Sequence, residues 1–285
     1  RSDAGECRPP HVVRQTMTEE RAAPTGWRAI TSTARPLQWA KNVLVFAAPG
    51  AGGQLDDWSN LGAATLAFVA CCLTSSGLYF WNDVFDREAD ARHPRKRFRP
   101  IAAGTLSVSS AMVIGTIGVI GGIALVALTG HWQAPATLAG YAVSTMAYSM
   151  WLKHVAVVDL VVIAAGFFLR AAIGAAATDV PMSKWFVLCT VFGSLFIAAG
   201  KRYAELHQVG PEAAAVRPTL GTYSLPYLRL VVTVALGATL LTYCQWALES
   251  DELVRGGSDS FINDPFYELS IVPMLTALLR YALVL

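Results

Sequence analysis

Charged side chains are scarce in this sequence. They account for 15% of its 285 residues, whereas hydrophobic residues account for 54%. A soluble globular domain carries roughly 25% charged residues, so this composition excludes an ordinary soluble domain as the bulk of the chain. The formal net charge is only +2, and we expect no nucleic-acid partner.

Cysteine is also sparse, and the N-terminus lacks a secretory signal. The five cysteines show no CxxC or metal-like spacing, and four lie in or near apolar runs. A free cysteine there behaves as a small hydrophobe, so we expect neither disulfides nor zinc. Residues 1–30 are polar, with no apolar core before a cleavage site. We expect a mostly disordered cytoplasmic segment there.

The chain is instead rich in long apolar runs. Several reach about 20 residues, enough to cross a bilayer as a helix, and a helix pairs all its backbone groups internally in hydrocarbon. We therefore predict an all-α fold, a polytopic membrane helical bundle with one domain over residues 31–285. The expected spans are residues 37–54, 59–81, 107–129, 133–151, 155–177, 183–200, 222–248 and 267–285.

Lysine and arginine are distributed unequally between the two sets of loops. With the N-terminus inside, seventeen of the 22 fall on the inner side, whereas the opposite loops carry only Lys184 and Arg255. Cytoplasmic loops are enriched in these residues. We therefore expect a multi-pass protein of the inner (plasma) membrane, with residues 82–104 facing the cytoplasm.

The stretch NDVFDREADARHPRKRFRPIAAG, residues 82–104, joins two apolar runs. Asn82, Asp86 and Asp90 are spaced by four residues, and Asp83 lies three before Asp86. On a helix with 3.6 residues per turn these four side chains share one face. Carboxylates so placed repel each other unless a cation lies between them. Hard oxygen ligands of this kind suit Mg²⁺ held together with substrate phosphates.

A basic cluster follows these carboxylates. A divalent ion held beside several cations, at the end of a membrane helix, is what a diphosphate-bearing substrate needs. We therefore interpret the stretch as a metal and diphosphate site rather than as a solvated helix end. The basic residues are Arg95, Lys96, Arg97 and Arg99.

Polar residues also open the first expected span and close the fourth. The polar residues at the start of the first span are interpreted as phosphate contacts, although the Lys41 side chain can also snorkel to the membrane interface. At the end of the fourth, Tyr148 and Lys153 are candidate substrate contacts, and the alternative for Lys153 is a simple membrane anchor. The first group consists of Arg35, Gln38, Lys41 and Asn42.

Two ionisable residues lie inside the fifth expected span. Asp159 and Arg170 are eleven residues apart, so they share a helix face at about 16 Å, too far to pair directly. Such residues are costly in a membrane and are functional or internally paired by default. We place Asp159 at the polar floor of a substrate cavity. Arg170 is either a structural ion-pair partner or a lipid-phosphate contact.

The sixth expected span ends in GKRYAELH. Lys201 and Arg202 add phosphate-binding charge, and arginine suits bidentate contacts. Arg202 and Glu205 are three residues apart and project together. Glu205 is a candidate metal contact or an acceptor for a substrate hydroxyl, and the alternative is an ordinary basic helix cap. Tyr223 is a weaker candidate donor into the same cavity.

NDVFDREAD followed by FRPIAAG resembles the UbiA superfamily of intramembrane prenyltransferases, in which an N-D-x-x-D-x-x-x-D helix binds Mg²⁺ and a diphosphate. The resemblance extends from about residue 35 onward and implies a UbiA-like transmembrane catalytic domain. It also implies a ninth span after Leu285, because the family commonly has nine. Metal and diphosphate binding is carried over to Asn82, Asp83, Asp86 and Asp90.

One departure from the family pattern bears on the substrate. Typical aromatic prenyltransferases carry a second aspartate-rich motif after the sixth span, whereas KRYAEL has one acid and two bases. With RPLQWAKNVLVFAAP and HPRKRFRP, this resembles a branch that transfers 5-phosphoribosyl from phosphoribosyl pyrophosphate to decaprenyl phosphate, for cell-wall arabinan precursors. The three phosphate-bearing groups of these substrates call for more cations than one isoprenyl diphosphate does.

The implied mechanism uses Asp83, Asp86, Asp90 and Glu205 as catalytic residues. Mg²⁺ would neutralise the leaving diphosphate, while Lys41, Arg97 and Arg202 hold phosphates and Tyr203 orients the ribose or the metal. The lipid phosphate is already anionic and needs no general base.

Two other functions remain open, and so does the oligomeric state. One is an aromatic prenyltransferase with an isoprenyl diphosphate donor. The other is a transporter of an anionic metabolite, although transporter sites tend to lie near the midplane. Small residues recur in the spans and permit close helix packing within one chain or in a homo-oligomer.

Overall fold

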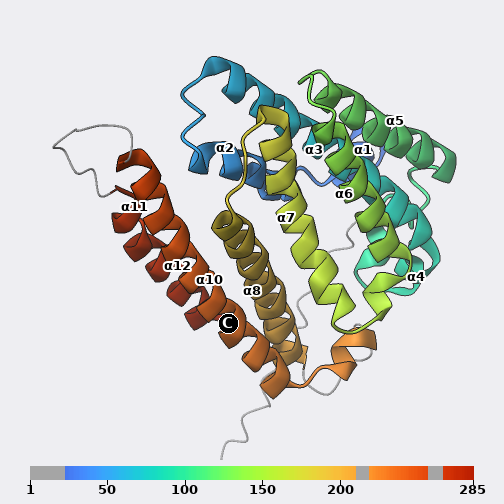
Figure 1. Ribbon diagram of the computed structural model, residues 1–285. Coiled ribbons are helices and arrows are strands. Elements are labelled where there is room, and N and C mark those ends of the chain that lie inside the picture. Colours follow the sequence, from blue (N-terminus) through green and yellow to red (C-terminus); the bar gives the residue numbers. More distant parts are fainter. Residues whose placement is uncertain (1–22, 210–217, 256–265) are drawn as a thin grey trace, which may run out of the picture.

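The computed structural model describes residues 23–209, 218–255 and 266–285, and every regular element in these ranges is helical (Figure 1). The predicted all-α fold is confirmed. The long helices are α3 (Trp58–Phe85), α5 (Val108–Ala127), α6 (Gln133–Met150), α7 (Val158–Thr178), α8 (Lys184–Val209) and α10 (Leu225–Arg255). The shorter elements are α1 (Gly26–Ala34), the 3₁₀ helix η1 (Pro36–Phe46), α2 (Ala47–Ala51), α4 (Arg87–Arg92), η2 (Lys96–Phe98), η3 (Leu152–His154), η5 (Pro218–Thr222), α11 (Phe266–Leu269) and α12 (Ile271–Val284).

Six helical segments of the described chain are long and apolar enough to cross a bilayer, against the eight spans expected. They are α3, α5, α7, α8, α10 and the segment Tyr267–Val284. Helix α6 forms where the fourth span is expected, but it is not among the six. The prediction of a continuous α-helix over 37–54 is wrong, because this segment is η1 followed by the short α2.

Proline and glycine account for the broken first segment. Pro36 opens η1, and Pro49 removes a backbone N–H from α2. The segment packs closely against α7 instead. A β-carbon added to Gly174 would lie only 1.7 Å from the Val45 carbonyl oxygen, so only glycine fits this backbone contact. Asn42 of η1 is thereby held in the interior of the bundle, whereas Lys41 remains exposed.

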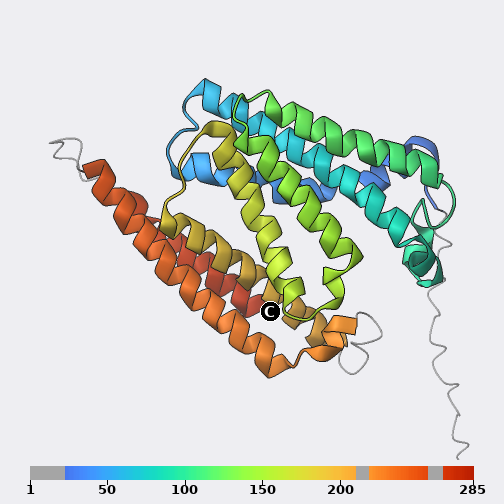
Figure 2. The same cartoon turned by 45° about the vertical axis from the view of Figure 1, so that its right-hand side comes forward.

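Helix α7 is the centre of the bundle. It packs against α6, α8, η1 and α3, so most of the functional segments contact it. Figures 1 and 2 show α8, α10 and α12 side by side on one side of α7, with α3 and α5 on the other. Leu78, Leu138 and Ile173 are buried in the core that joins α3, α6 and α7.

The N-terminal segment is more ordered than predicted. Residues 26–30 begin α1, although the sequence indicates disorder over 1–30. Ala29 is fully buried, and Ile30 packs against a cluster that contains Phe80 and Ile101. Burial of this apolar face against α3 accounts for the helix. Residues 1–22 of the predicted segment lie outside the described residues.

Candidate active site

The predicted acidic face is interrupted at Asp86. Helix α3 ends at Phe85 and α4 begins at Arg87, while Asp86 between them has φ −86° and ψ 2°. Helical hydrogen bonds still run across the junction, from Asp86 N–H to Asn82 O (2.9 Å) and from Asp90 N–H to Asp86 O (2.8 Å). The prediction of one unbroken helix is therefore wrong. Asp86 and the other two aspartates contact different cations.

Asp83 and Asp90 share a cation. Arg99 Nη1 lies 2.6 Å from Asp90 Oδ2 and 3.2 Å from Asp83 Oδ1, and both carboxylates are only 3–4% exposed. Arg35 Nη2 is 2.6 Å from the same Asp83 oxygen. Arg35 adopts a left-handed conformation (φ 54°) between α1 and η1, and its guanidinium also lies over the Tyr79 ring. Buried carboxylates need such partners, since an unpaired buried charge is costly.

Asp86 has different partners. Lys153, from η3, places Nζ 2.9 Å from Asp86 Oδ1. Asn82 Nδ2 donates to Asp86 Oδ2 at 3.2 Å. Predicted residues from the end of α3 and from the α6–α7 connection are thus brought together, although they are far apart in sequence.

The predicted metal ligands are divided between different cations: Asp83 and Asp90 contact Arg99, whereas Asp86 contacts Lys153. Within the described ranges, no three acidic, histidine or cysteine side chains converge closely enough to hold a metal ion. Arg99 lies between Asp83 and Asp90, where a positive charge is needed. The oxygens of these two residues, of Asp86 and of Asn82 remain the hard donor set that suits Mg²⁺.

The basic cluster divides into one inward residue and three outward ones. Arg99 reaches the carboxylates, whereas Arg95, Lys96 and Arg97 are exposed and form no ion pair with any described residue. The Arg97 guanidinium lies over the Phe98 ring. Their contact with substrate stays a prediction.

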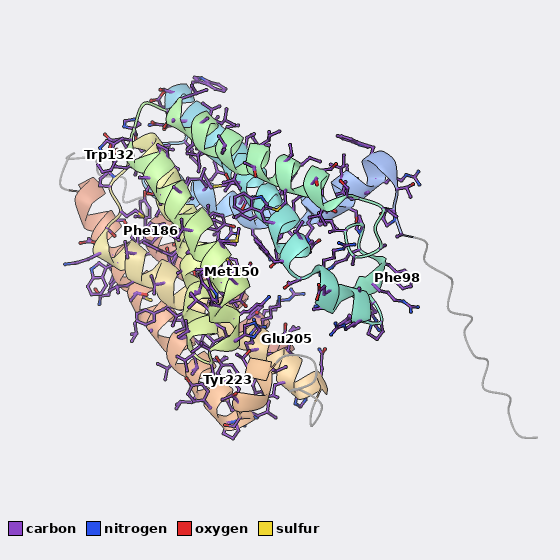
Figure 3. All side chains as sticks on the ribbon, turned by 90° about the vertical axis from the view of Figure 1, so that its right-hand side faces the viewer. Phe98, Trp132, Met150, Phe186, Glu205 and Tyr223 are labelled. Atoms are coloured by element: carbon purple, nitrogen blue, oxygen red, sulfur yellow. The ribbon has the colours of Figure 1, made fainter. Side chains whose placement is uncertain are left out.

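A second charged cluster joins α7, α8 and the segment between η5 and α10. Asp159 is fully buried, and Arg202 Nε lies 3.2 Å from its Oδ2. Arg202 Nη1 lies 2.6 Å from Glu205 Oε2, as the three-residue spacing predicts. The Tyr148 phenol, at the end of α6, lies near Arg202. Figure 3 shows Glu205 and Tyr223 near the same end of the bundle, with Trp132 at the opposite end.

Tyr223 completes this cluster. Its hydroxyl donates a hydrogen bond to Asp159 Oδ1 and accepts one from the Val157 N–H at 2.6 Å. Burial, and then the bond to Asp159, raise the pKa of Tyr223 above its ordinary value. Val157 has φ 70°, which is unusual for a β-branched residue. The sequence gives little signal for this arrangement, because Val157 looks like an ordinary apolar residue.

Arg170 is buried deep in α7 and pairs with neutral groups. Its Nε donates to Asn42 Oδ1 at 2.9 Å, its Nη2 to the Tyr141 hydroxyl at 2.8 Å, and its Nη1 to Gly166 O at 2.5 Å. The described residues offer it no carboxylate partner. Asn42 therefore joins η1 to α7, a role that its polarity alone does not reveal.

Four predicted contacts have no carboxylate partner among the described residues and no place in these clusters. Lys41 and Lys201 are exposed and form no ion pair within the described chain, yet the charges of Lys201 and Arg170 both act on Lys41. Gln38 is partly buried in η1. The Tyr203 hydroxyl turns toward Arg229, which donates to it at 3.1 Å.

The fold and these clusters define a class, the polytopic helical membrane proteins with a charged site at one end of the bundle. The model of the UbiA prenyltransferase family matches residues 43–254. The chain belongs to this family.

Relatives and a solved structure agree with the family. The chain is 42% identical over 261 residues to decaprenyl-phosphate phosphoribosyltransferase of Mycobacterium tuberculosis, covering 89% of this chain and 82% of that protein. It is 38% identical over 281 residues to the protein of the same name from Mycolicibacterium smegmatis, covering 94% and 87%. A UbiA homolog from Archaeoglobus fulgidus, bound to DMAPP and Mg²⁺, has the same fold, with a TM-score of 0.67 at 13% identity over 90% of this chain and 86% of that one.

Proposed function

We propose that this chain transfers 5-phosphoribosyl from phosphoribosyl pyrophosphate to decaprenyl phosphate and releases diphosphate, in the synthesis of a cell-wall arabinan precursor. The observation that carries the proposal is the second cluster. Its centre is a buried arginine between Asp159 and Glu205, in place of a second acid-rich motif. Because Asp159 and Glu205 are both paired with Arg202, they do not form the second metal site expected for an isoprenyl diphosphate donor with an aromatic acceptor. Lys41 and Lys201, which form no ion pair within the described chain, supply cations for phosphate. The names of the relatives support the same choice.

The first cluster is proposed to hold the donor diphosphate. Asp83, Asp86, Asp90 and Asn82 would hold Mg²⁺, which supplies neutralisation of the leaving-group charge when bound. Arg99 and Lys153 now lie on these carboxylates. If these carboxylates held Mg²⁺ instead, the Arg99 and Lys153 side chains would be placed to contact the donor diphosphate.

The remaining cations are proposed to hold the other phosphates. Lys41 and Lys201 repel each other and have no acid partner in the described chain, so a phosphate between them would stabilise both. Glu205 is only partly buried and is placed to accept a hydrogen bond from a ribose hydroxyl. Arg202 keeps Glu205 in this orientation.

The reaction needs little proton transfer. The ribose C1–O bond to the diphosphate breaks, and an oxygen of the lipid phosphate forms the new bond to C1. The attacking phosphate is already anionic, so no general base is required. Holding the two substrates together and stabilising charge are the chain's contributions to rate. We place this site on the cytoplasmic side of the plasma membrane, because the lysine- and arginine-rich loops lie at this end.

The test is transfer of radiolabel from ribose-labelled phosphoribosyl pyrophosphate into an organic-extractable lipid. Purified protein, decaprenyl phosphate and Mg²⁺ are supplied, and the variants are Asp86→Ala and Glu88→Ala. Glu88 is the matched control, an exposed acid on α4 outside both clusters. We expect label in the lipid that is lost with EDTA and with Asp86→Ala but kept with Glu88→Ala.

Absence of label from a folded wild-type preparation would refute the phosphoribosyl donor. Isoprenyl diphosphates with aromatic acceptors would then be the next substrates to assay.

A further inference from the structure

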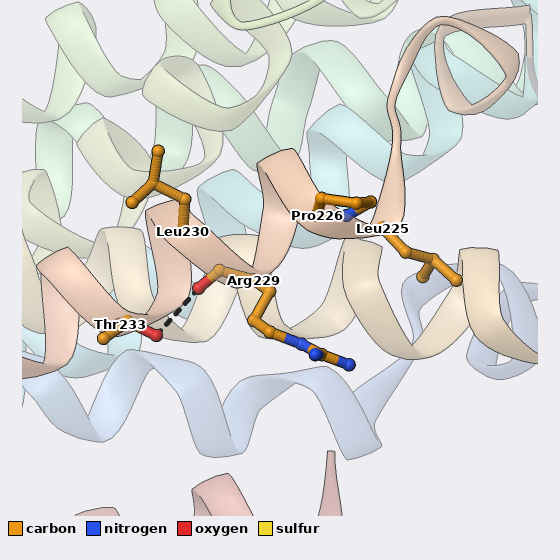
Figure 4. A pocket seen from close by; sticks show the side chains of 5 residues that line it. All are labelled: Leu225, Pro226, Arg229, Leu230 and Thr233. Atoms are coloured by element: carbon orange, nitrogen blue, oxygen red, sulfur yellow. Dashed lines mark hydrogen bonds between the residues drawn. The ribbon is translucent and has the colours of Figure 1, made fainter.

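A hollow of about 380 Å³ opens at the start of α10, outside both charged clusters. Figure 4 shows its lining, with the Arg229 side chain extended back toward Leu225 and the first turn of the helix. The Thr233 hydroxyl is turned inward and donates to the Arg229 carbonyl at 2.9 Å. The hollow is thus mostly apolar with one cation at its edge. Its lining residues are Leu225, Pro226, Arg229, Leu230 and Thr233.

Arg229 has no acid partner among the described residues. Its guanidinium is exposed, and its contacts are the Tyr203 hydroxyl at 3.1 Å and the face of the Tyr203 ring at 5.9 Å. A phenol is neutral and leaves the positive charge uncompensated. The arrangement therefore leaves room for an anion on the guanidinium.

The position of Arg229 selects the kind of anion. The membrane-crossing part of α10 begins at Leu225, so Arg229 lies in its first two turns. Its neighbours Leu230 and Val234 are 61% and 59% exposed, as expected for a lipid-facing surface. Lipid phosphates lie at the edge of the hydrocarbon and attract arginine there. A phosphate attached to an apolar chain therefore matches this lining better than a fully polar metabolite does.

We propose that the hollow is a docking site for the phosphate of the polyprenyl phosphate acceptor. This inference rests on the proposed function. A polyprenyl phosphate has one phosphate and one apolar chain, which match one guanidinium and an apolar lining. Arg229 contacts Tyr203, which follows Arg202 on α8, so the hollow adjoins the same turn of α8 that carries the second cluster. The acceptor then reaches Arg229 from the exposed, apolar side of α10, where Leu230 and Val234 lie, separately from the donor.

Kinetics with three variants test this docking site. The variants are Arg229→Ala, Arg229→Lys and, as the matched control, Arg280→Ala. Arg280 is also an exposed arginine in a membrane-crossing helix, and it forms no ion pair within the described chain. We expect Arg229→Ala to raise KM for decaprenyl phosphate about tenfold, as loss of one charge-assisted contact predicts. Arg229→Lys should recover part of this, and KM for phosphoribosyl pyrophosphate should be unchanged in all three.

Direct binding separates this proposal from the proposed function. A short-chain polyprenyl phosphate is titrated into detergent-solubilised protein without donor, with the corresponding polyprenol as the probe that lacks phosphate. We expect weaker binding of the phosphate by Arg229→Ala than by Arg280→Ala, and equal binding of the polyprenol. This result can hold even where no phosphoribosyl transfer is detected.

Two results would overturn the docking site. One is equal acceptor KM and equal phosphate binding in Arg229→Ala and Arg280→Ala. The other is displacement of the polyprenyl phosphate by equimolar phosphatidylglycerol, which would make the hollow a general phospholipid site.

Discussion

Arg99 Nη1 lies 2.6 Å from Asp90 Oδ2, and the same nitrogen contacts Asp83. One guanidinium thus joins two buried carboxylates across the junction of α3 and α4. Because the carboxylates repel each other, whatever replaces Arg99 between them must also be positive. Arginine and a divalent ion are therefore expected to compete for these oxygens.

Arg99→Ala should make the folded state dependent on a divalent ion. Without metal we expect a loss of about 1–3 kcal/mol, less than the roughly 3–5 kcal/mol for a fully buried pair, because Arg99 is 29% exposed. Saturating Mg²⁺ should restore most of it. Thermal unfolding in detergent, with EDTA or with Mg²⁺, measures the effect. Arg97→Ala is the matched control and should show no such difference. An equal loss in both conditions would mean that no ion replaces the arginine.

Tyr223→Phe should lower both stability and activity, and the loss of activity should act through Arg202. The change removes a hydrogen bond to the buried Asp159, which holds Arg202. A buried acceptor that loses a donor costs about 1–3 kcal/mol, or roughly tenfold in kcat/KM for phosphoribosyl pyrophosphate. Steady-state kinetics measure this. Asp159→Asn combined with Tyr223→Phe should be clearly non-additive, and simple additivity would contradict the positioning role.

The matched control is Tyr227→Phe, since Tyr227 stacks on Tyr223 but is more exposed.

The pH dependence of the stability follows from the raised pKa of Tyr223. A raised folded-state pKa means that the stabilisation is complete below the unfolded value of about 10 and is lost only as pH rises beyond it. The difference in Tm between wild type and Tyr223→Phe should therefore be constant between about pH 7 and pH 9.

Sequence periodicity predicts the helices well where the apolar run is continuous. The segment 37–54 is different, because its length and hydropathy indicate a membrane helix while Pro49 and the close approach of Val45 to Gly174 produce a 3₁₀ segment. That approach depends on a residue more than a hundred positions away. No local pattern reveals it.

In the candidate site, too, local contacts are predictable from the sequence and contacts between distant residues are not. The spacing of Arg202 and Glu205 correctly predicts their contact. By contrast, the contact of Lys153 with Asp86 joins residues 67 positions apart, and charge spacing along one helix cannot indicate it. The periodic face of aspartates is also incomplete as a guide, because it omits the cations that other elements bring to it.

Gly174→Ala should destabilise the bundle by displacing η1. The new β-carbon would overlap the Val45 carbonyl oxygen at 1.7 Å, and overpacking of this kind costs about 1–3 kcal/mol or more. Thermal unfolding in detergent measures the loss. Gly121→Ala is the matched control, because a β-carbon there meets nothing within 4 Å. Equal Tm values for the two variants would refute the close backbone contact.

Arg170→Lys tests whether the buried arginine acts as a hydrogen-bonding junction. Three of its nitrogens reach Asn42, Tyr141 and the Gly166 carbonyl, and a lysine cannot reach all three from its single nitrogen. We expect a loss of about 1–3 kcal/mol in unfolding free energy, together with a higher KM for the donor, because η1 carries Lys41 and is tied to α7 through Asn42.

A double-mutant cycle with Asn42→Ala gives the decisive measurement. If Arg170 acts through Asn42, the double variant should lose about 0.5–3 kcal/mol less unfolding free energy than the sum of the two single variants. Fully additive losses would instead mean that Arg170 affects the donor by its charge alone. In that case Arg170→Lys, which keeps the charge, should leave the KM for phosphoribosyl pyrophosphate unchanged. The same pair of variants thus separates a role of the Arg170 hydrogen bonds from a role of the Arg170 charge.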